Sequence, residues 1–146
     1  MDLYLPSFDH KLRKVDGKLQ IWDIVRKKFI ILTPEEWVRQ HYLHYLTQIL
    51  KYPATLITVE GGLHYNSSRK RTDIVVYQND GIPYIVIECK ASYLNLNQST
   101  VRQASIYYNK LNPYYLVLTN GISEKIICLK EQETQLLSIP PYVTEQ

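Results

Sequence analysis

Hydrophobic residues recur at helical spacing after Thr33, and the stretch opens with a strong helix-start signal. Thr33 is a favourable N-cap, Pro34 follows at the first helical position, and Glu36 falls at the third, which together make a capping box. The apolar positions that follow are Val38, Tyr42, Tyr45, Leu46 and Ile49. Their spacing predicts an amphipathic helix with one buried stripe, which Pro53 ends.

A different pattern occupies the middle of the chain. Residues 72–78 and 82–90 are rich in β-branched side chains and are separated only by Asn79-Asp80-Gly81. Asp-Gly favours a two-residue hairpin turn. Both runs are apolar at odd and at even positions, which is typical of strands covered on both faces. The pattern therefore predicts a central antiparallel pair of strands.

Weaker patterns complete the fold prediction. Residues 19–25 and 28–32 predict a short hairpin, 56–60 a strand ended by Gly61-Gly62, 99–111 a second helix ended by Asn112-Pro113, and 114–119 and 125–129 two strands joined through Asn120-Gly121. This order of elements predicts an α/β fold in three layers, with a mixed central sheet flanked by helices.

The chain length bounds the organisation. A chain of 146 residues, with 45% apolar and 21% charged residues, suits one globular domain. We expect an N-terminal arm over residues 1–18, the main domain over 19–130, and a surface tail with Pro140-Pro141 over 131–146. No internal repeat or low-complexity tract interrupts this plan.

Several classes of protein are disfavoured. No apolar run approaches the roughly 20 residues of a membrane helix, and the N-terminus lacks a signal-peptide pattern. Cys89 and Cys128 lie in apolar, strand-like contexts, so we expect two reduced, buried thiols in a cytoplasmic protein. The net charge of +3 hints only weakly at a polyanionic partner.

The central hairpin carries the candidate chemistry. A two-residue turn at Asp80-Gly81 places Asp73 opposite Glu88, and it places Pro83 opposite Gln78, where the missing N–H removes no ladder bond. Lys90 is two residues beyond Glu88 and so projects from the same face. We expect two carboxylates and a lysine at one end of the central strands.

Two neighbouring carboxylates without a cation are unfavourable, because like charges force one to stay protonated. A hard divalent cation, Mg²⁺ or Mn²⁺, relieves this and accepts carboxylate and carbonyl oxygens. Asp73, Glu88 and the Cys89 carbonyl are the candidate metal ligands, and Lys90 is placed to orient or deprotonate a metal-bound water or to stabilise charge on a phosphate. The alternative is a structural role, in which Asp73 caps a strand and Glu88 pairs with Lys90.

The helices add further candidates. Gln103 and Tyr107 are four residues apart on one face of the second predicted helix, at the border of its apolar stripe, and we expect both to face the cluster. In the first helix, Glu35 falls on the apolar face, and Glu36 has a sufficient role in the capping box; either of the two could contribute an acid to the site, with Glu35 as the named candidate. His41 and His44 are expected on the exposed side of the same helix.

These motifs together resemble the PD-(D/E)xK nuclease superfamily, in its variant with a helical Gln-x-x-x-Tyr. The resemblance spans about residues 21–129 and is greatest to stand-alone relatives of the N-terminal nuclease domain of type I restriction enzyme R subunits. It rests on Arg71-Thr72-Asp73, Ile87-Glu88-Cys89-Lys90, Gln103-x-x-x-Tyr107, residues 33–40 (TPEEWVRQ) and Leu118-Thr119-Asn120-Gly121.

The resemblance implies a restriction-endonuclease-like core and a magnesium-dependent endodeoxyribonuclease that acts on DNA. It implies that Asp73 and Glu88 hold the metal, that Lys90 assists catalysis, and that Gln103 and Tyr107 support the site or touch DNA. No proline precedes Asp73, and no Gly-x-x-x-x-Gly-Lys-[Ser/Thr] loop of an ATPase motor occurs in this chain.

Three functions remain open at this point: a nuclease, a DNA-binding or assembly module that keeps the fold with little activity, and a domain that binds a small ligand. The intact Asp/Glu/Lys set favours the first. The modest charge suggests that a homodimer or a larger restriction or repair assembly completes the DNA-binding surface. The basic run Arg69-Lys70-Arg71 is either a solvated loop or a phosphate contact beside the metal.

Overall fold

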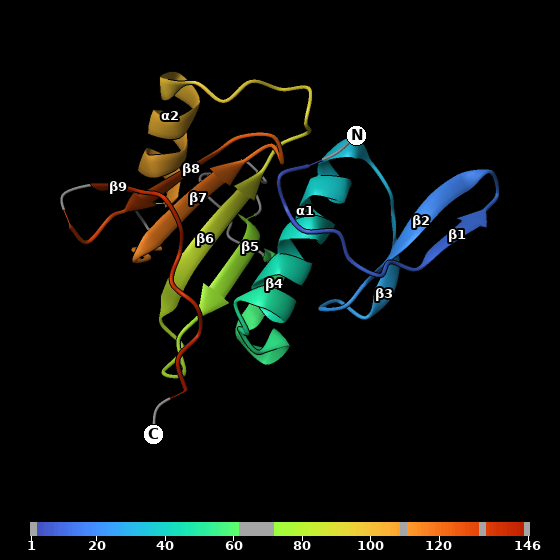
Figure 1. Ribbon diagram of the computed structural model, residues 1–146, viewed down its shortest axis with the longest axis horizontal. Coiled ribbons are helices and arrows are strands. Elements are labelled where there is room, and N and C mark those ends of the chain that lie inside the picture. Colours follow the sequence, from blue (N-terminus) through green and yellow to red (C-terminus); the bar gives the residue numbers. More distant parts are fainter. Residues whose placement is uncertain (1–2, 62–71, 109–110, 132–133, 145–146) are drawn as a thin grey trace.

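The computed structural model describes residues 3–61, 72–108, 111–131 and 134–144 (Figure 1). The strands are β1 (Leu12–Val15), β2 (Lys18–Asp23), β3 (Lys28–Ile31), β4 (Ile57–Gly61), β5 (Thr72–Tyr77), β6 (Pro83–Cys89), β7 (Tyr115–Thr119), β8 (Glu124–Cys128) and β9 (Thr134–Leu136). The helical elements are α1 (Pro34–His44), the π-helical turn η1 (Tyr45–Ile49), the 3₁₀ turn η2 (Ala54–Leu56) and α2 (Gln98–Tyr108).

Within these residues the strands form two sheets. The large sheet has the order β4-β5-β6-β7-β8-β9, and the small one has the order β1-β2-β3. Neighbours in the large sheet are antiparallel except β6 and β7, which run parallel. A parallel pair needs a crossover connection, and α2 lies within it. The carboxyl ends of β6 and β7 therefore meet at one end of the sheet.

The two helices cover opposite faces of the large sheet (Figure 1). The α1 side buries Val38, Tyr42, Leu43 and Leu46 against alternate residues of β5 and β6, which include Ile74, Val76, Ile85 and Ile87. The α2 side buries Ala104 and Tyr108 against Val75, Val86 and Leu116. Since β5 and β6 bury side chains on both faces, the predicted three-layer α/β arrangement with a mixed sheet is confirmed.

The start of α1 matches its prediction, but its end does not. Thr33 is the N-cap, and its hydroxyl accepts the Glu36 N–H at 3.0 Å. At the other end the Leu50 N–H bonds to the Tyr45 carbonyl five residues back, which defines a π-helical turn. The wider turn shifts the stripe by one position, so Ile49 is 53% exposed and Leu50 is 8% exposed. The predicted burial of Ile49 was wrong.

The hairpin turn contains three residues and not two. The Gly81 N–H donates to the Gln78 carbonyl, the Gln78 N–H donates to the Ile82 carbonyl, and Gly81 has φ of +85°. A tight turn followed by a residue in the left-handed region is the usual geometry of a three-residue hairpin loop. The two-residue turn predicted at Asp80-Gly81 was therefore wrong.

A bulge between Val76 and Tyr77 compensates for the longer turn. Tyr77, and not Gln78, pairs with Pro83, but beyond the bulge Ile74 pairs with Ile87, as the sequence predicted. The predicted alignment of the strand ends is thus correct, although the proline argument for it was not.

Both ends of the chain are more structured than expected. The Tyr4 N–H donates to the Gly121 carbonyl at 2.9 Å, Leu5 is 6% exposed, and Leu12–Val15 form β1 on the edge of the small sheet. In the expected tail, Thr134–Leu136 pair with β8 as β9. We predicted that residues 1–18 and 131–146 extend from the domain as an arm and a tail. In their described parts, backbone hydrogen bonds instead attach both segments to the rest of the fold.

His41 and His44 are buried, against expectation. They are 7% and 8% exposed, because the N-terminal segment crosses α1 and stacks the Phe8 ring on His44 with the ring centroids 4.0 Å apart. His41 Nδ1 lies 2.8 Å from the Trp37 carbonyl oxygen. Burial lowers the pKa of both imidazoles, so the folded protein holds them neutral.

This burial predicts a loss of stability in acid. Below about pH 6.5 these two histidines become protonated in the unfolded chain but stay neutral in the folded protein. Protonation therefore favours the unfolded state, and the free energy of unfolding falls as the pH decreases. The contribution of each histidine reaches about 1.4 kcal/mol per pH unit. We expect His44→Phe, which keeps a ring against Phe8, to reduce the difference in the free energy of unfolding between neutral and mildly acidic urea titrations. An unchanged difference contradicts the assignment to His44.

Both cysteines are free and buried, as predicted. None of the helices in the described part of the chain has the length and apolar character needed to cross a bilayer.

Candidate active site

Asp73 lies at the start of β5, beside the end of β6. Its Oδ2 accepts the Cys89 N–H at 2.6 Å, and its Oδ1 accepts a hydrogen bond from Arg39 Nη2 at 2.8 Å. Asp73 and Glu88 are one position beyond the ladder pair of Ile74 with Ile87 and are therefore cross-strand neighbours. The structure thus brings the two predicted carboxylates to the same end of the sheet.

Glu88 and Lys90 form an ion pair at this end, with 3.0 Å between Lys90 Nζ and Glu88 Oε1. Their side chains are 20% and 32% exposed, while Cys89 between them is completely buried. The alternation expected of a strand therefore holds through Cys89. The Lys90 N–H bonds to the Thr119 carbonyl of β7, which fixes the backbone that carries the lysine.

Arg39 of α1 is the member of this cluster that sequence reasoning missed. Its side chain is 3% exposed, and its Nη2 contacts both Asp73 Oδ1 and Glu35 Oε2, the latter at 3.1 Å. Its Nη1 contacts Glu36. Arg39 therefore places Glu35, a predicted candidate, beside Asp73, although the Glu35 side chain is 43% exposed.

Glu36 has a different role from the one predicted. The carboxylate accepts hydrogen bonds from Arg26, Arg39 and Gln40, so it connects the turn between β2 and β3 with α1. Asp23 continues this network through Arg26 and Gln40. We call these linked side chains, together with the neighbouring Glu88–Lys90 pair, the ion network; its described members are Asp23, Arg26, Glu35, Glu36, Arg39, Gln40, Asp73, Glu88 and Lys90.

The ion network carries excess negative charge. Its described members include five carboxylates and three cations, which leaves a net charge of −2 when all are ionised. Burial raises the pKa of Asp73 to about 6, although Arg39 and the Cys89 N–H oppose this. The pKa of Arg39 is also raised, because Asp73 and Glu36 outweigh the opposing effect of burial. The network thus holds Arg39 charged while leaving the Asp73 carboxylate incompletely compensated.

The donor set suits a hard cation. Asp73, Glu88 and the Cys89 carbonyl offer oxygen ligands, and a divalent ion would balance the excess charge of the network. No group of three or more His, Cys, Asp or Glu side chains arranged to hold a metal occurs within the described ranges. A metal here would therefore rest on two carboxylates, backbone and water, which is the mode Mg²⁺ commonly adopts.

Gln103 does not reach the cluster. It is exposed, and it makes no hydrogen bond to Asp73, Glu88 or Lys90, all of which are described. The reason is that Ala104 and Tyr108 direct α2 onto the sheet, so the position before Ala104 turns toward solvent. The expectation that Gln103 faces the cluster was wrong. The Tyr107 side chain lies outside the described residues, as does Arg69-Lys70-Arg71.

The Asn120-Gly121 motif has a structural role. Asn120 Oδ1 accepts the backbone N–H groups of Ile122 and Ser123, and its amide donates to the Leu94 carbonyl at 2.7 Å. This ties the loop after β6 to the turn after β7. The motif thus supports the sheet end that carries Lys90.

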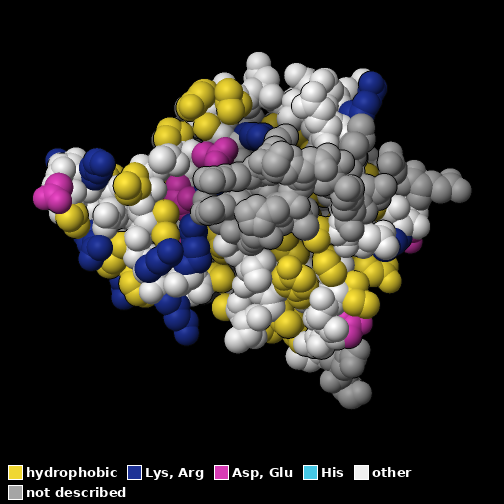
Figure 2. Space-filling model, turned by 180° about the vertical axis from the view of Figure 1, so that it is seen from behind, with side chains coloured by type: hydrophobic (Ala, Val, Ile, Leu, Met, Phe, Trp, Pro, Cys, Tyr) yellow, Lys and Arg dark blue, Asp and Glu magenta, His cyan; other side chains and the backbone are white. Residues whose placement is uncertain are grey.

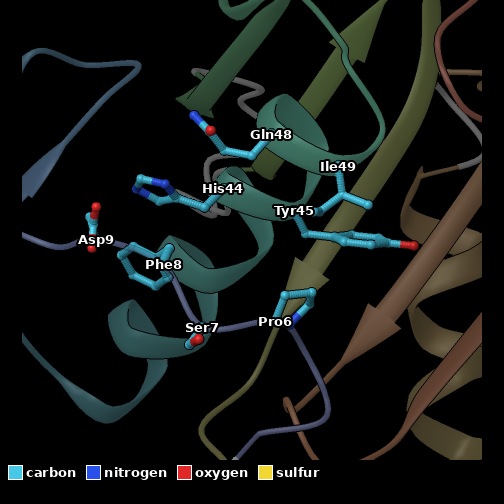
Figure 3. A pocket seen from close by; sticks show the side chains of 8 residues that line it. All are labelled: Pro6, Ser7, Phe8, Asp9, His44, Tyr45, Gln48 and Ile49. Carbon is cyan, nitrogen blue, oxygen red and sulfur yellow. The ribbon is translucent and has the colours of Figure 1, made fainter.

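A sizeable cavity lies elsewhere, between the N-terminal segment and the end of α1 (Figure 3). It measures about 540 Å³ and is lined by Pro6, Ser7, Phe8, Asp9, His44, Tyr45, Gln48 and Ile49. Asp73, Glu88 and Lys90 do not line it. The candidate active site is therefore distinct from this cavity.

Comparison with known proteins supports the relation suggested by the motifs. A solved fragment from Vibrio vulnificus YJ016, assigned as an HsdR subunit of a type I restriction enzyme, matches with a TM-score of 0.54 and 21% identity. The match covers 75% of this chain and 24% of that chain, and at this identity it shows a shared fold. No curated protein sequence matches. The family model for the type I restriction enzyme R protein N terminus matches residues 34–140, and the chain therefore belongs to that family.

Proposed function

We propose that this protein is a metal-dependent nuclease that hydrolyses phosphodiester bonds in DNA. The observation that carries the proposal is the meeting of Asp73, Glu88 and Lys90 at one end of the central strands, within a network of excess negative charge. The relation to the R protein N terminus supports DNA as the substrate, since that family is named for a restriction enzyme.

Each residue has a distinct task in this proposal. Asp73, Glu88 and the Cys89 carbonyl hold Mg²⁺ or Mn²⁺, which supplies an activated water and charge neutralisation when bound. Lys90 acts as a cation beside the phosphate, because Glu88, Asp73 and Glu35 together outweigh the opposing effect of burial and raise its pKa above the usual value. Arg39 positions Asp73 and Glu35, and Glu35 is a candidate site residue beside the two metal-binding carboxylates. Tyr107 remains a candidate site residue, and the exposed Gln103 is a candidate DNA contact.

The second candidate function is a DNA-binding or assembly module with little activity. One observation favours it: both Asp73 oxygens already accept hydrogen bonds, from Arg39 and from the Cys89 N–H. In a restriction assembly or a homodimer such a module supplies contacts without cleaving DNA. A metal-binding measurement and a cleavage measurement separate the two functions.

The cleavage measurement uses supercoiled plasmid DNA and the purified protein. The nuclease proposal expects nicked and linear products with Mg²⁺ or Mn²⁺ and none when EDTA is added, because a bound metal would activate the attacking water. Stable DNA binding with no product under metal saturation selects the assembly module instead.

The metal measurement is calorimetric titration with Mn²⁺. We expect Asp73→Ala to weaken Mn²⁺ binding by more than about tenfold, since even groups that only support a ligand contribute that much. Glu131→Ala, which removes an exposed carboxylate outside the ion network, is the matched control. Equal affinity in the wild type and Asp73→Ala excludes Asp73 as a ligand.

A further inference from the structure

The small sheet concentrates the positive charge of the protein. Residues 11–31, which we call the basic lobe, contain seven Lys and Arg against two Asp, whereas the rest of the chain has a net charge of −2. Six of the seven are exposed: Lys11, Arg13, Lys14, Lys18, Lys27 and Lys28. Figure 2 shows dark blue side chains gathered over this part of the molecule. The net charge of +3 is modest because the negative charge of the rest of the chain partly offsets a strongly basic region.

The outer face of the basic lobe is packed. Arg13 lies over the Phe29 ring at 3.9 Å and donates to Gln20, and the Trp22 ring meets Phe29 edge to face with 5.2 Å between centroids. Phe29 and Trp22 are each only partly exposed. These rings are held by one another and by Arg13, so they stiffen the lobe and are poorly placed to stack with unpaired bases.

The base of the lobe is joined to the candidate active site. The Asp23 carboxylate at the end of β2 pairs with Arg26 at 2.8 Å, and Arg26 pairs with Glu36 at 2.6 Å. Arg39 contacts both Glu36 and Asp73. This series of buried and partly buried ion pairs fixes the orientation of the small sheet relative to the Asp73 cluster.

The basic lobe also lies outside the part of the chain that matches the family. The family model begins at residue 34, at the start of α1, whereas β3 ends at Ile31. The family match therefore does not account for the positive charge of the basic lobe.

We propose that the basic lobe binds the sugar-phosphate backbone of double-stranded DNA alongside the Asp73 cluster. The inference rests on the proposed function for its choice of DNA. Exposed lysines on all three strands and their turns form salt-dependent contacts with phosphates, which need no sequence recognition. A duplex is favoured over a single strand, because single-strand binding relies on open aromatic faces, whereas here Arg13 lies over the Phe29 ring and Trp22 meets that ring edge to face.

The test measures binding of a fluorescein-labelled duplex by anisotropy in EDTA, so that no cleavage is required. The lobe variant replaces one exposed lysine from each strand of the small sheet: Lys14→Gln, Lys18→Gln and Lys28→Gln. The control variant removes the same charge elsewhere: Lys51→Gln, Lys125→Gln and Lys130→Gln. Circular dichroism and Tm confirm that both variants are folded, as expected for exposed positions.

We expect the lobe variant to bind the duplex more than about tenfold more weakly than the wild type. We also expect the slope of log K against log salt to fall in magnitude by up to about 3, one for each phosphate that a lysine no longer neutralises. The control variant should retain most of the affinity. Arg13 is left intact, because its packing on Phe29 makes it structural as well.

Three results overturn the proposal: duplex binding unchanged in the lobe variant, equal weakening by the control variant, or no duplex binding by the wild type. Tighter binding of single-stranded DNA that is abolished in the lobe variant overturns the choice of a duplex. Since EDTA prevents cleavage, a protein that binds as expected but never cleaves DNA contradicts only the nuclease proposal.

Discussion

Lys90→Ala should lower metal-dependent cleavage of plasmid DNA by about a hundredfold or more, the loss typical when one preorganised hydrogen-bond donor is removed from the place where negative charge develops. Lys90 is bonded to Glu88 and lies within the field of Asp73 and Glu35, all of which support its charged form. Its ammonium is therefore held in the charged form at the end of β6.

The fold should survive this substitution. The Lys90 side chain is 32% exposed, and its one ion pair in the described part of the chain is with Glu88, itself 20% exposed. An ion pair that remains partly open to solvent contributes little, about 1 kcal/mol or less, so Tm should change little. Lys125→Ala, an exposed lysine of β8 outside the ion network, is the matched control and should cleave like the wild type.

Lys90→Arg tests the role of the charge. An arginine keeps a cation near the phosphate but cannot deprotonate water at neutral pH. Partial activity in Lys90→Arg with a loss in Lys90→Ala supports electrostatic stabilisation, whereas equal loss in both indicates that the lysine acts as a base. Wild-type cleavage by Lys90→Ala, under saturating Mg²⁺ or Mn²⁺, removes Lys90 from the mechanism.

The positions of Asp73, Glu88 and Lys90 could be predicted because they depend on local rules. Strand alternation places Glu88 and Lys90 together, and hairpin pairing brings Asp73 to the same end. The turn was predicted one residue too short, and the bulge at Val76 and Tyr77 cancelled the error. A bulge has no reliable sequence signal, so the correct alignment was partly fortuitous.

The burial of Arg39 could not be predicted in the same way. Its spacing from Glu35 and Glu36 indicates helical ion pairs, which are usually solvated. It is buried because the turn after β2, the helix and the strand ends converge on it, and these segments are distant in sequence. His41 and His44 illustrate the same limit, because a segment more than thirty residues earlier in the chain covers them.

The orientation of α2 is a third case. Its apolar residues Ala104 and Tyr108 face the sheet as predicted, so its helical phase was correct. The prediction for Gln103 was wrong because it assumed a particular place for α2 on the sheet. The helix packs on β7, and in that place Gln103, next to the buried Ala104, is exposed to solvent. Periodicity determines which face of a helix is buried, whereas the connections determine what the remaining faces meet.

Arg39→Met should be the most destabilising substitution within the ion network. Arg39 is 3% exposed and is paired with Glu36 and Asp73, which are 5% and 14% exposed. Removal of one partner from a buried ion pair leaves uncompensated charge and costs about 3 to 5 kcal/mol. For a chain of this length that loss lowers Tm by roughly 10 °C. Arg102→Met on the exposed face of α2 is the control and should leave Tm nearly unchanged.

A double-mutant cycle connects this loss to the candidate active site. Asp73→Asn keeps an oxygen that can accept the Cys89 N–H but no longer needs the guanidinium as a counter-charge. We therefore expect Arg39→Met to destabilise the Asp73→Asn variant by about 0.5 to 3 kcal/mol less than it destabilises the wild type, the range measured for residues in one network. Strictly additive losses in urea titrations would show that Arg39 and Asp73 do not stabilise each other. A non-additive result, by contrast, would show that Arg39 both stabilises the fold and holds the Asp73 carboxylate in place. In that case Arg39→Met should lower the free energy of unfolding and the metal affinity together.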